Sequence, residues 1–205
     1  MKVESIVLGS IGTNCYIVTN EETKECFAVD MAECPQEYVN YIKNNGLEMK
    51  ALFLTHGHFD HIMGIDDFLK AFPVPVYAGE DELPVIEDDR LNVSCMYGPK
   101  YAFHGAQPVR DGQVIECAGI EIDVLHTPGH TVGGCCYYLP KEHRLFSGDT
   151  LFCAYIGRTA LPTGSGQLVR SVQEKIMILP DDTKIYPGHM EETSVQFEKE
   201  HNPFI

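Results

Sequence analysis

Short apolar runs separated by turn residues recur along the chain and predict β-strands. Runs of β-branched and aromatic residues bounded by glycine or polar clusters are typical of strands that pack in a core. The predicted strands are Lys2–Leu8, Cys15–Thr19, Glu25–Val29, Ala51–Leu54, Gly119–Leu125, Gly134–Leu139, Arg144–Ser147 and Lys184–Tyr186. Strands are therefore expected throughout the chain.

Helical periodicity interrupts these strands in three places. Tyr38, Val39 and Ile42 lie on one face of a predicted helix that ends at Gly46. The two other predicted helices span Ile62–Phe72 and Gln167–Leu179. Helices interspersed with strands predict a mixed α/β fold, with sheet layers inside and helices outside.

Length and charge restrict the function classes. At 205 residues the chain is expected to form one domain, residues 1–205, large enough to bury a core without disulfides. Its formal net charge is −15 and no basic stripe is visible, which excludes a broad nucleic-acid-binding surface. No apolar run reaches the roughly 20 residues of a membrane span. One irregular region, about residues 88–112, has the length of a functional cover or a disordered loop.

The eight cysteines include no Cys-x-x-Cys pair, so the sequence encodes neither a zinc ribbon nor a dithiol redox centre. Most of them lie in apolar, strand-like segments such as Gly134–Tyr138, where a reduced thiol acts as a small core hydrophobe. The N-terminal residues Met1–Ser5 do not open a signal-peptide-like apolar run. These features predict free, buried thiols in a cytoplasmic protein.

Three histidines and an aspartate within six residues follow the fourth predicted strand. Imidazole nitrogen and carboxylate oxygen are preferred ligands of zinc and iron. In an extended segment His56 and His58 project to the same side, so both can reach one ion. Asp60 and His61 come after the chain turns into a helix, so they can face a second position nearby. Gly57 is expected to let the backbone approach the ions closely.

Three tight turns elsewhere carry further ligand-type residues. His130 and His189 each follow a Pro-Gly pair just after a predicted strand, and Asp149 lies in a Ser-Gly-Asp-Thr turn at the end of another. Turns at strand ends can hold ligands rigidly and leave the site open to solvent. Together with the histidine-rich segment, they predict one metal centre at a sheet edge.

The order His-x-His-x-Asp-His, Pro-Gly-His, Ser-Gly-Asp-Thr and Tyr-Pro-Gly-His resembles the metallo-β-lactamase-fold hydrolase superfamily, and within it the glyoxalase II (hydroxyacylglutathione hydrolase)-like group. The similarity runs nearly end to end and includes Asn14-Cys15-Tyr16, Asn92-Val93-Ser94, Gly157-Arg158-Thr159 and Asn202-Pro203-Phe204. The resemblance implies an αββα sandwich with a dinuclear metal site at one sheet edge. It assigns one ion to His56, His58 and His130, the other to Asp60, His61 and His189, and makes Asp149 the bridge.

Two departures from the family pattern concern the substrate. Glyoxalase II enzymes carry a further C-terminal helical region that supplies basic groups to glutathione, and this chain ends at Ile205 without it. Met190 follows His189 at a position where these sequences often have glycine. The chain therefore resembles the single-domain bacterial members of the group.

The resemblance and the ligand types together imply a metal-dependent hydrolase of a thioester or related activated acyl bond in an S-acylglutathione-like substrate. Two divalent ions, zinc first and iron or manganese as alternatives, would lower the pKa of bound water to about 7 and supply a bridging hydroxide. Asp60 would bind an ion, orient the nucleophile and pass a proton to the leaving group. Arg158 is the candidate for binding a substrate carboxylate, and Tyr155 for lining the pocket.

The expected partner is a small anionic thioester, with no nucleic acid and no membrane. Two divalent ions outweigh the carboxylates of Asp60 and Asp149, so the site would be locally cationic although the chain is acidic. A small anion can therefore bind at the ions even where a polyanion would be repelled by the surface.

Other reactions on the same scaffold fit the sequence too. A mononuclear iron persulfide dioxygenase shares the His-x-His-x-Asp-His motif, and lactonase or phosphodiesterase activity is a further alternative. A flavodiiron oxidoreductase is disfavoured because its relatives have glutamate at the position of His58. A class B1 β-lactamase is disfavoured because it would have arginine at His61 and a cysteine ligand near Asp149. A non-catalytic role in metal storage or partner binding would leave a complete two-metal site unexplained.

Overall fold

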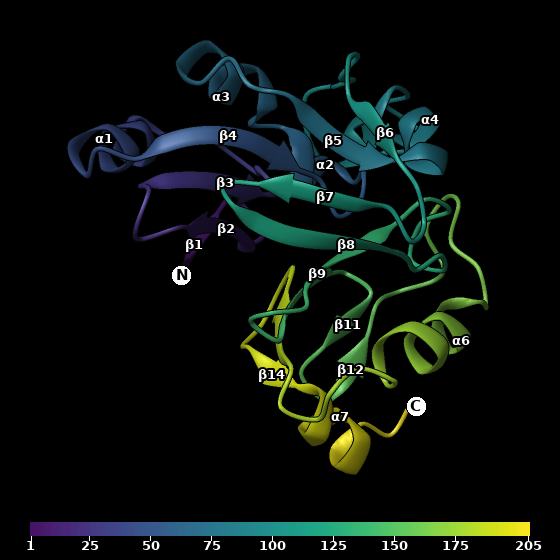
Figure 1. Ribbon diagram of the computed structural model, residues 1–205. Helices are drawn as coiled ribbons and strands as arrows, with labels where there is room; N and C mark the ends of the chain where they lie inside the picture. The colour runs from purple at the N-terminus through teal and green to yellow at the C-terminus, as the bar shows by residue number, and fades with distance from the viewer.

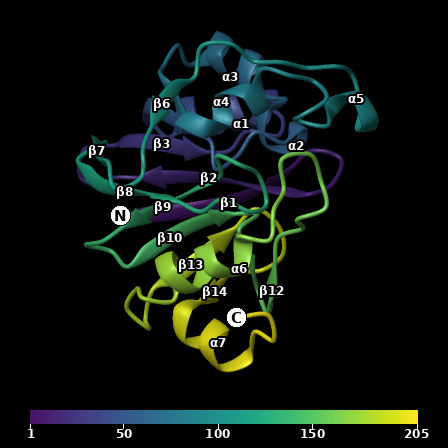
Figure 2. The same ribbon diagram turned by 90° about the vertical axis from the view of Figure 1, so that its right-hand side faces the viewer.

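Two six-stranded sheets pack face to face in the computed structural model, which describes residues 1–205, and helices cover both outer faces. Figure 1 shows these layers, with α1 (Gln36–Asn44), α3 (Ile65–Ala71) and α4 (Leu83–Ile86) on one side and α6 (Leu168–Ser171) and α7 (Val195–His201) on the other. In Figure 2 the C-terminus lies beside α7 in the outer layer, whereas the N-terminus lies at the level of the sheets. The predicted αββα sandwich is confirmed.

The first sheet follows the order of the sequence. Its strands are β1 (Lys2–Leu8), β2 (Thr13–Thr19), β3 (Glu25–Val29), β4 (Glu48–Phe53), β5 (Val76–Gly79) and β6 (Gln107–Val109). The first three strands pair antiparallel, and β3 to β6 pair parallel. Because parallel neighbours need crossover connections, α1 and α3 lie on the outer face, and β3 and β4 end at the same edge.

The second sheet is mixed as well. In spatial order its strands are β14 (Thr193–Ser194), β13 (Lys184–Pro187), β10 (Arg144–Gly148), β9 (Cys135–Leu139), β8 (Ile120–His126) and β7 (Val114–Cys117). Strands β7 to β10 form an antiparallel meander, and β13 runs parallel to β10. Strands β8, β10 and β13 therefore all end at one edge. A small hairpin of β11 (Leu151–Phe152) and β12 (Tyr155–Ile156) follows β10.

Both faces of the inner strands are buried. In β2, Tyr16 and Val18 join the cluster between the two sheets, and Ile17 joins the cluster under α1 and α3. A third cluster lies between the second sheet and α6 and α7. Strands that are covered on both faces read as continuous apolar runs, which is why the sequence pattern identified them.

The single helix predicted over Ile62–Phe72 is wrong. The structure has two helices, α2 (Phe59–Ile62) and α3, with a break at Gly64. The Gly64 N–H donates to the Met31 carbonyl (2.9 Å), and a Cβ on Gly64 would lie 2.6 Å from the backbone of Glu33. The segment after β3 therefore packs directly against the backbone of Gly64, and α2 ends after one turn.

The helix predicted over Gln167–Leu179 differs in its second half. It is α-helical over α6 and continues as a π-helical turn, η2 (Val172–Ile176). The Met177 N–H donates to the Val172 carbonyl five residues earlier (2.9 Å), and both Val172 and Ile176 pack into the outer cluster of the second sheet. None of the helices combines the length and hydropathy that crossing a membrane requires.

The irregular region of residues 88–112 is a hydrogen-bonded segment that contains α5 (Ser94–Tyr97) and β6. The Asn92 side-chain amide donates to the Tyr101 carbonyl (2.8 Å), and the Tyr101 N–H donates to Ser94 Oγ (3.0 Å). The Phe59 N–H donates to the Asn92 carbonyl (2.9 Å), which joins the loop to α2. The loop is thus fixed beside the histidine-rich segment.

All eight cysteines are free, which confirms the prediction. The buried ones are Cys15, Cys26, Cys117, Cys135 and Cys136, whereas Cys95 is exposed. Burial raises the pKa of the Cys15 and Cys26 thiols to about 12, so neither is a reactive thiolate near neutral pH.

Thiol accessibility gives a direct check of this packing. In the native protein at pH 8, we expect a disulfide reagent such as Ellman's reagent to modify Cys95 rapidly and the five buried thiols only after denaturant is added. The released chromophore, followed with time, separates the two classes. Equal, rapid modification of all eight thiols in the native protein would contradict the buried placement.

Candidate metal centre

Four strand ends bring ligand-type residues to one edge of the sandwich. His56 and His58 follow β4 of the first sheet. His130, Asp149 and His189 follow β8, β10 and β13, which end at the same edge of the second sheet. The structure therefore gathers residues from both sheets at the end where their strands terminate, as the positions of the turns predict.

Hydrogen bonds join the two sheets at this edge. The Cys135 N–H donates to the Thr55 carbonyl (2.8 Å), and the Tyr16 hydroxyl donates to the Pro187 carbonyl (2.6 Å). Thr55 immediately precedes His56, and Pro187 lies two residues before His189. The positions of the ligand-bearing turns from the two sheets are thus fixed relative to each other.

His56, His58 and His130 form a first group. One ligand atom from each lies within 4.8 Å of the others. Nδ1 of His58 and Nε2 of His130 are 2.9 Å apart, and Nδ1 of His130 lies 2.7 Å from the Arg158 carbonyl oxygen. That backbone contact orients the His130 ring toward the other two histidines.

Asp60, His61 and His189 form a second group, again with ligand atoms within 4.8 Å of one another. Oδ2 of Asp60 lies 3.1 Å from Nε2 of His189 and 3.3 Å from Nε2 of His61. The Thr13 hydroxyl donates to the same Asp60 oxygen (2.9 Å). The second group thus includes the residues that the one-turn helix α2 carries.

Asp149 lies between the two groups. Its Oδ1 is 3.4 Å from Nε2 of His61, and its Oδ2 is 3.5 Å from Nε2 of His130 and 3.7 Å from Nε2 of His189. One carboxylate therefore faces histidines of both groups. A third set of residues, His56, His61 and Asp149, also has ligand atoms within 4.8 Å of one another, so the two groups adjoin. The division of the seven residues between two ions stays a prediction from the family resemblance.

The unpartnered polar atoms and the donor types of the cluster are those of a metal site. Buried polar atoms are almost always hydrogen-bonded, yet Nε2 of His56, His58 and His61 and Oδ1 of Asp149 have no hydrogen-bond partner. Imidazole nitrogens and carboxylate oxygens at this spacing are the donor set of divalent zinc or iron. The residues present therefore fit divalent ions.

The protonation of the two groups differs. Burial lowers the pKa of His58 to about 3 and also lowers the pKa of His56 and of His130, which favours the neutral form that binds metals. Burial opposes ionisation of Asp60 and Asp149, but His61 and the other neighbouring histidines together outweigh it and hold the pKa of both carboxyl groups below the usual value.

Asp30 is a residue of the site that the sequence reasoning missed. It follows β3, is buried, and accepts hydrogen bonds from the Thr55 N–H and the Thr55 hydroxyl (both 2.7 Å). Its Oδ2 also lies 2.8 Å from Nδ1 of His61. A proton on Nδ1 leaves Nε2 of His61 free to face the cluster. A carboxylate directly after an apolar strand was the signal that could have identified it.

The two predicted substrate contacts occupy different surroundings. The Arg158 side chain is exposed and forms no ion pair, although its own carbonyl holds His130. Tyr155 is 47% exposed, and its ring packs edge-on against Phe204 with 4.7 Å between centroids. The Asn202 amide donates to the Tyr155 carbonyl (3.2 Å). Tyr155 is thus anchored to the C-terminal segment, whereas the Arg158 side chain is free and only its backbone contacts the first group.

Met190 adopts a left-handed backbone conformation, with φ at +69°. Glycine adopts this conformation most readily, which agrees with the glycine that the resemblance leads one to expect there. The Asn14 side-chain amide holds the turn by donating to the Pro187 carbonyl (3.0 Å) and to the Met190 carbonyl (2.9 Å). The Met190 side chain is 55% exposed, beside His189.

A cavity of about 460 Å³ adjoins the second group, because Asp60 is one of its lining residues. Its aromatic wall consists of Phe59 and Tyr97, whose rings stack at 5.2 Å between centroids and 7° between planes. The turn before β2 and the segment after β3 supply the opposite side, including Ser10 and Glu33. Space for a substrate group is therefore present next to the ligand cluster.

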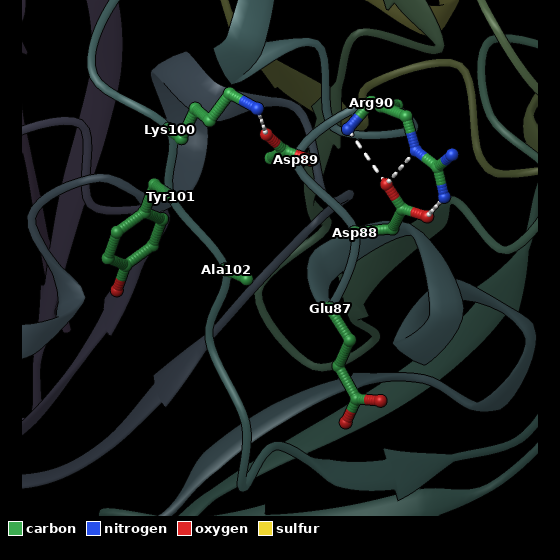
Figure 3. Close-up of a pocket in the computed structure, with 7 residues that line it drawn as sticks. All are labelled: Glu87, Asp88, Asp89, Arg90, Lys100, Tyr101 and Ala102. Atoms are coloured by element: carbon green, nitrogen blue, oxygen red, sulfur yellow. Dashed lines mark hydrogen bonds and ion pairs between the residues drawn. The ribbon is translucent and has the colours of Figure 1, made fainter.

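A second hollow lies on the loop of residues 88–112 and contains no ligand-type histidine. Figure 3 shows two ion pairs among its side chains, Arg90 with Asp88 (2.7 Å) and Lys100 with Asp89 (3.2 Å). These exposed pairs contribute little to binding or stability. The hollow is a feature of the loop surface and is separate from the ligand cluster.

Comparison with known proteins agrees with this geometry. The profile of the "Metallo-beta-lactamase superfamily" matches residues 8–189, a span that includes all seven candidate ligands. The chain belongs to the metallo-β-lactamase superfamily. The resemblance inferred from the motifs is thereby confirmed.

Two relatives match along the whole chain. "Probable metallo-hydrolase YqgX" of Bacillus subtilis is 34% identical over 208 residues, which cover 100% of this chain and 98% of the relative. "Hydroxyacylglutathione hydrolase GloC" of Haemophilus influenzae is 28% identical over 214 residues, which cover 100% and 98%. The chain is accordingly a metallo-hydrolase of the superfamily.

Two solved structures are similar in fold and sequence. The BLEG-1 B3 metallo-beta-lactamase superposes with a TM-score of 0.93 at 36% identity, over 99% of each chain. TTHA1623, crystallised in a di-iron-bound form, superposes with a TM-score of 0.86 at 30% identity, over 98% of this chain and 100% of its own. Together with the His/Asp cluster, these similarities identify a divalent-metal site.

Proposed function

We propose that this protein is a dinuclear metal hydrolase of the glyoxalase II type, which cleaves a thioester or related activated acyl bond in a small anionic, S-acylglutathione-like substrate of the cytoplasm. The observation that carries the proposal is the position of Asp149, whose two oxygens face histidines of both groups. Asp149 could therefore help to hold an ion at each group, and two such ions would supply charge stabilisation for acyl transfer. Zinc is the proposed ion, with iron or manganese as alternatives.

The chain's own residues position the reaction. When bound, the divalent ions supply a hydroxide nucleophile near neutral pH and polarise the acyl carbonyl. Asp60 is fixed by the Thr13 hydroxyl and by His189, and it is ionised, so its carboxylate can accept a hydrogen bond from the nucleophile and orient it. A thiolate leaves with little need for protonation, which agrees with a cluster that includes no separate acid.

The surroundings of the cluster suit an anionic acyl-thiol. The cavity beside Asp60, with its Phe59–Tyr97 wall, can hold one end of the substrate. Arg158, whose backbone carbonyl contacts His130 and whose side chain forms no ion pair, is the proposed group for binding a carboxylate at the other end. The relative GloC is named a hydroxyacylglutathione hydrolase, and this name supports the same substrate class.

The test is a substrate panel on protein loaded with two equivalents of zinc or iron. S-lactoylglutathione and thioesters of other thiols should release thiol, measured with Ellman's reagent against a blank for the protein's own Cys95. Chelator-treated protein is the control, and readdition of metal should restore the rate. Failure of the fully metallated protein to cleave any thioester would refute the proposal.

The same panel separates the alternative reactions. A chromogenic cephalosporin tests β-lactam hydrolysis, a second candidate favoured by the 36% identity to the BLEG-1 B3 metallo-beta-lactamase. Oxygen uptake with glutathione persulfide tests a mononuclear iron dioxygenase, and lactones and phosphodiesters test the other hydrolases. Turnover of one of these in place of every thioester would assign that reaction instead.

A further inference from the structure

Glu82 is a fully buried carboxylate that the proposed reaction does not use. It is the last residue of the 3₁₀ turn η1 (Glu80–Glu82), and no lysine, arginine or histidine pairs with it. Its Oε1 accepts a hydrogen bond from the Gly57 N–H (2.7 Å), and its Oε2 accepts one from the Gly133 N–H (2.8 Å). Both oxygens are thus occupied by backbone groups that lie 25 and 51 positions away.

Those two backbone groups belong to the segments that carry the first histidine group. Gly57 lies between His56 and His58, after β4 of the first sheet. Gly133 lies three residues after His130, in the loop that connects β8 to β9 of the second sheet. One carboxylate therefore spans the gap between the sheets and holds all three histidine-bearing positions from outside the cluster.

The two glycines are needed for this contact. A Cβ on Gly133 would lie 2.0 Å from the Glu82 nitrogen, and a Cβ on Gly57 would lie 2.8 Å from the Ile86 side chain in α4. The sequence-based expectation that Gly57 allows close approach to the ions stays a prediction, and the structure adds a second reason for glycine at this position. Its close neighbours are protein atoms of the segment that follows Glu82.

A carboxylate is an unfavourable residue for mere space filling at this position. Burial raises the pKa of Glu82 to about 7, which reflects the free energy needed to keep an unpaired charge away from water. An apolar side chain of similar volume would fill the space without that penalty. Only a carboxylate offers two acceptor oxygens, and these can bind the backbone N–H groups of two loops at the same time.

We propose that Glu82 is a positioning residue that sets the placement of His56 and His58 relative to His130, and so controls affinity for the ion of the first group while leaving the second group unaffected. The inference rests on the two-ion assignment of the proposed function. Outer carboxylates that orient metal ligands commonly change metal affinity by about 10- to 100-fold when they are removed. Glu82 would act in this way through the backbone of two loops.

The experiment isolates each histidine group in turn and then removes the Glu82 carboxylate. His189→Ala disables the second group and leaves the first, whereas His58→Ala does the reverse. Zinc affinity is measured in each background by competition with a chelating dye, with and without Glu82→Gln. We expect Glu82→Gln to weaken zinc binding about 10- to 100-fold in the His189→Ala background and less than about 3-fold in the His58→Ala background.

Glu80→Gln is the matched control, because Glu80 belongs to the same turn but is exposed and pairs with Arg110 (2.7 Å). It should leave zinc affinity unchanged in both backgrounds. If Glu82→Gln does not fold, Glu82→Met replaces it as the test variant. Methionine is an apolar side chain of similar volume, and the same loss of zinc affinity is expected.

The outcomes are separable. An equal loss of affinity in both backgrounds indicates general loosening and overturns the inference, as does no loss in either. Wild-type protein that fails to bind two zinc ions would overturn the proposed function together with this inference. Two tightly bound ions with unchanged affinity in the Glu82 variants would overturn only the inference.

Discussion

Replacing Asp60 with alanine is expected to lower kcat for thioester hydrolysis about 10³-fold, within the range that a positioned acid–base group contributes. The variant should also lose most of its affinity for one of two zinc ions. The physical reason is that Asp60 Oδ2 is shared by the Thr13 hydroxyl (2.9 Å) and by the imidazoles of His189 and His61 (3.1 and 3.3 Å). Without it the second group has no carboxylate of its own.

Metal content by elemental analysis and kcat by thiol release should be measured on the same sample of this variant. Asp66→Ala is a matched control, because Asp66 is an exposed aspartate on the neighbouring helix α3. It should retain full activity and both ions. A folded Asp60→Ala protein that keeps two ions and loses no rate would eliminate the role given to Asp60.

The second large effect is expected at Asp30, which touches no substrate in the proposed reaction. Asp30→Ala should weaken binding of the ion of the second group about 10- to 100-fold, because Nδ1 of His61 loses its 2.8 Å partner. It should also lower the free energy of unfolding by about 2–4 kcal/mol, since the buried Thr55 N–H and hydroxyl are left without an acceptor.

Asp30→Asn distinguishes the two effects. The amide oxygen can still accept from Thr55, and asparagine tolerates the left-handed conformation of this position (φ +59°), so stability should fall less than in Asp30→Ala. The amide nitrogen cannot accept the hydrogen bond from Nδ1 of His61, so zinc affinity should remain low. Denaturant unfolding and dye competition measure the two quantities. Wild-type zinc affinity in both variants would show that Asp30 does not orient His61.

The metal-binding turns could be predicted from the sequence because each is a local feature. A strand of four to seven residues with a Pro-Gly or Ser-Gly turn at its end is encoded within about ten residues, as at His130, Asp149 and His189. The long inner strands were predicted for the same reason, since a strand buried on both faces is apolar throughout.

Errors in the predicted helices have a nonlocal cause. The break at Gly64 depends on the Met31 carbonyl, which accepts the Gly64 N–H in place of a carbonyl within the helix. The periodicity around Ile62 and Phe68 is that of one helix, because both residues face the same apolar cluster. No pattern within the segment could show that another strand end would interrupt it.

The sequence by itself determined which residues are the candidate ligands and that they lie at strand ends, because residue type and turn chemistry are local. The tertiary structure decided that the seven side chains meet in one cluster, since their contacts depend on which strand ends adjoin across two sheets. It also revealed Asp30 and Glu82. Their hydrogen bonds connect residues 25 to 51 positions apart, and such separations become contacts only when the sheets pack.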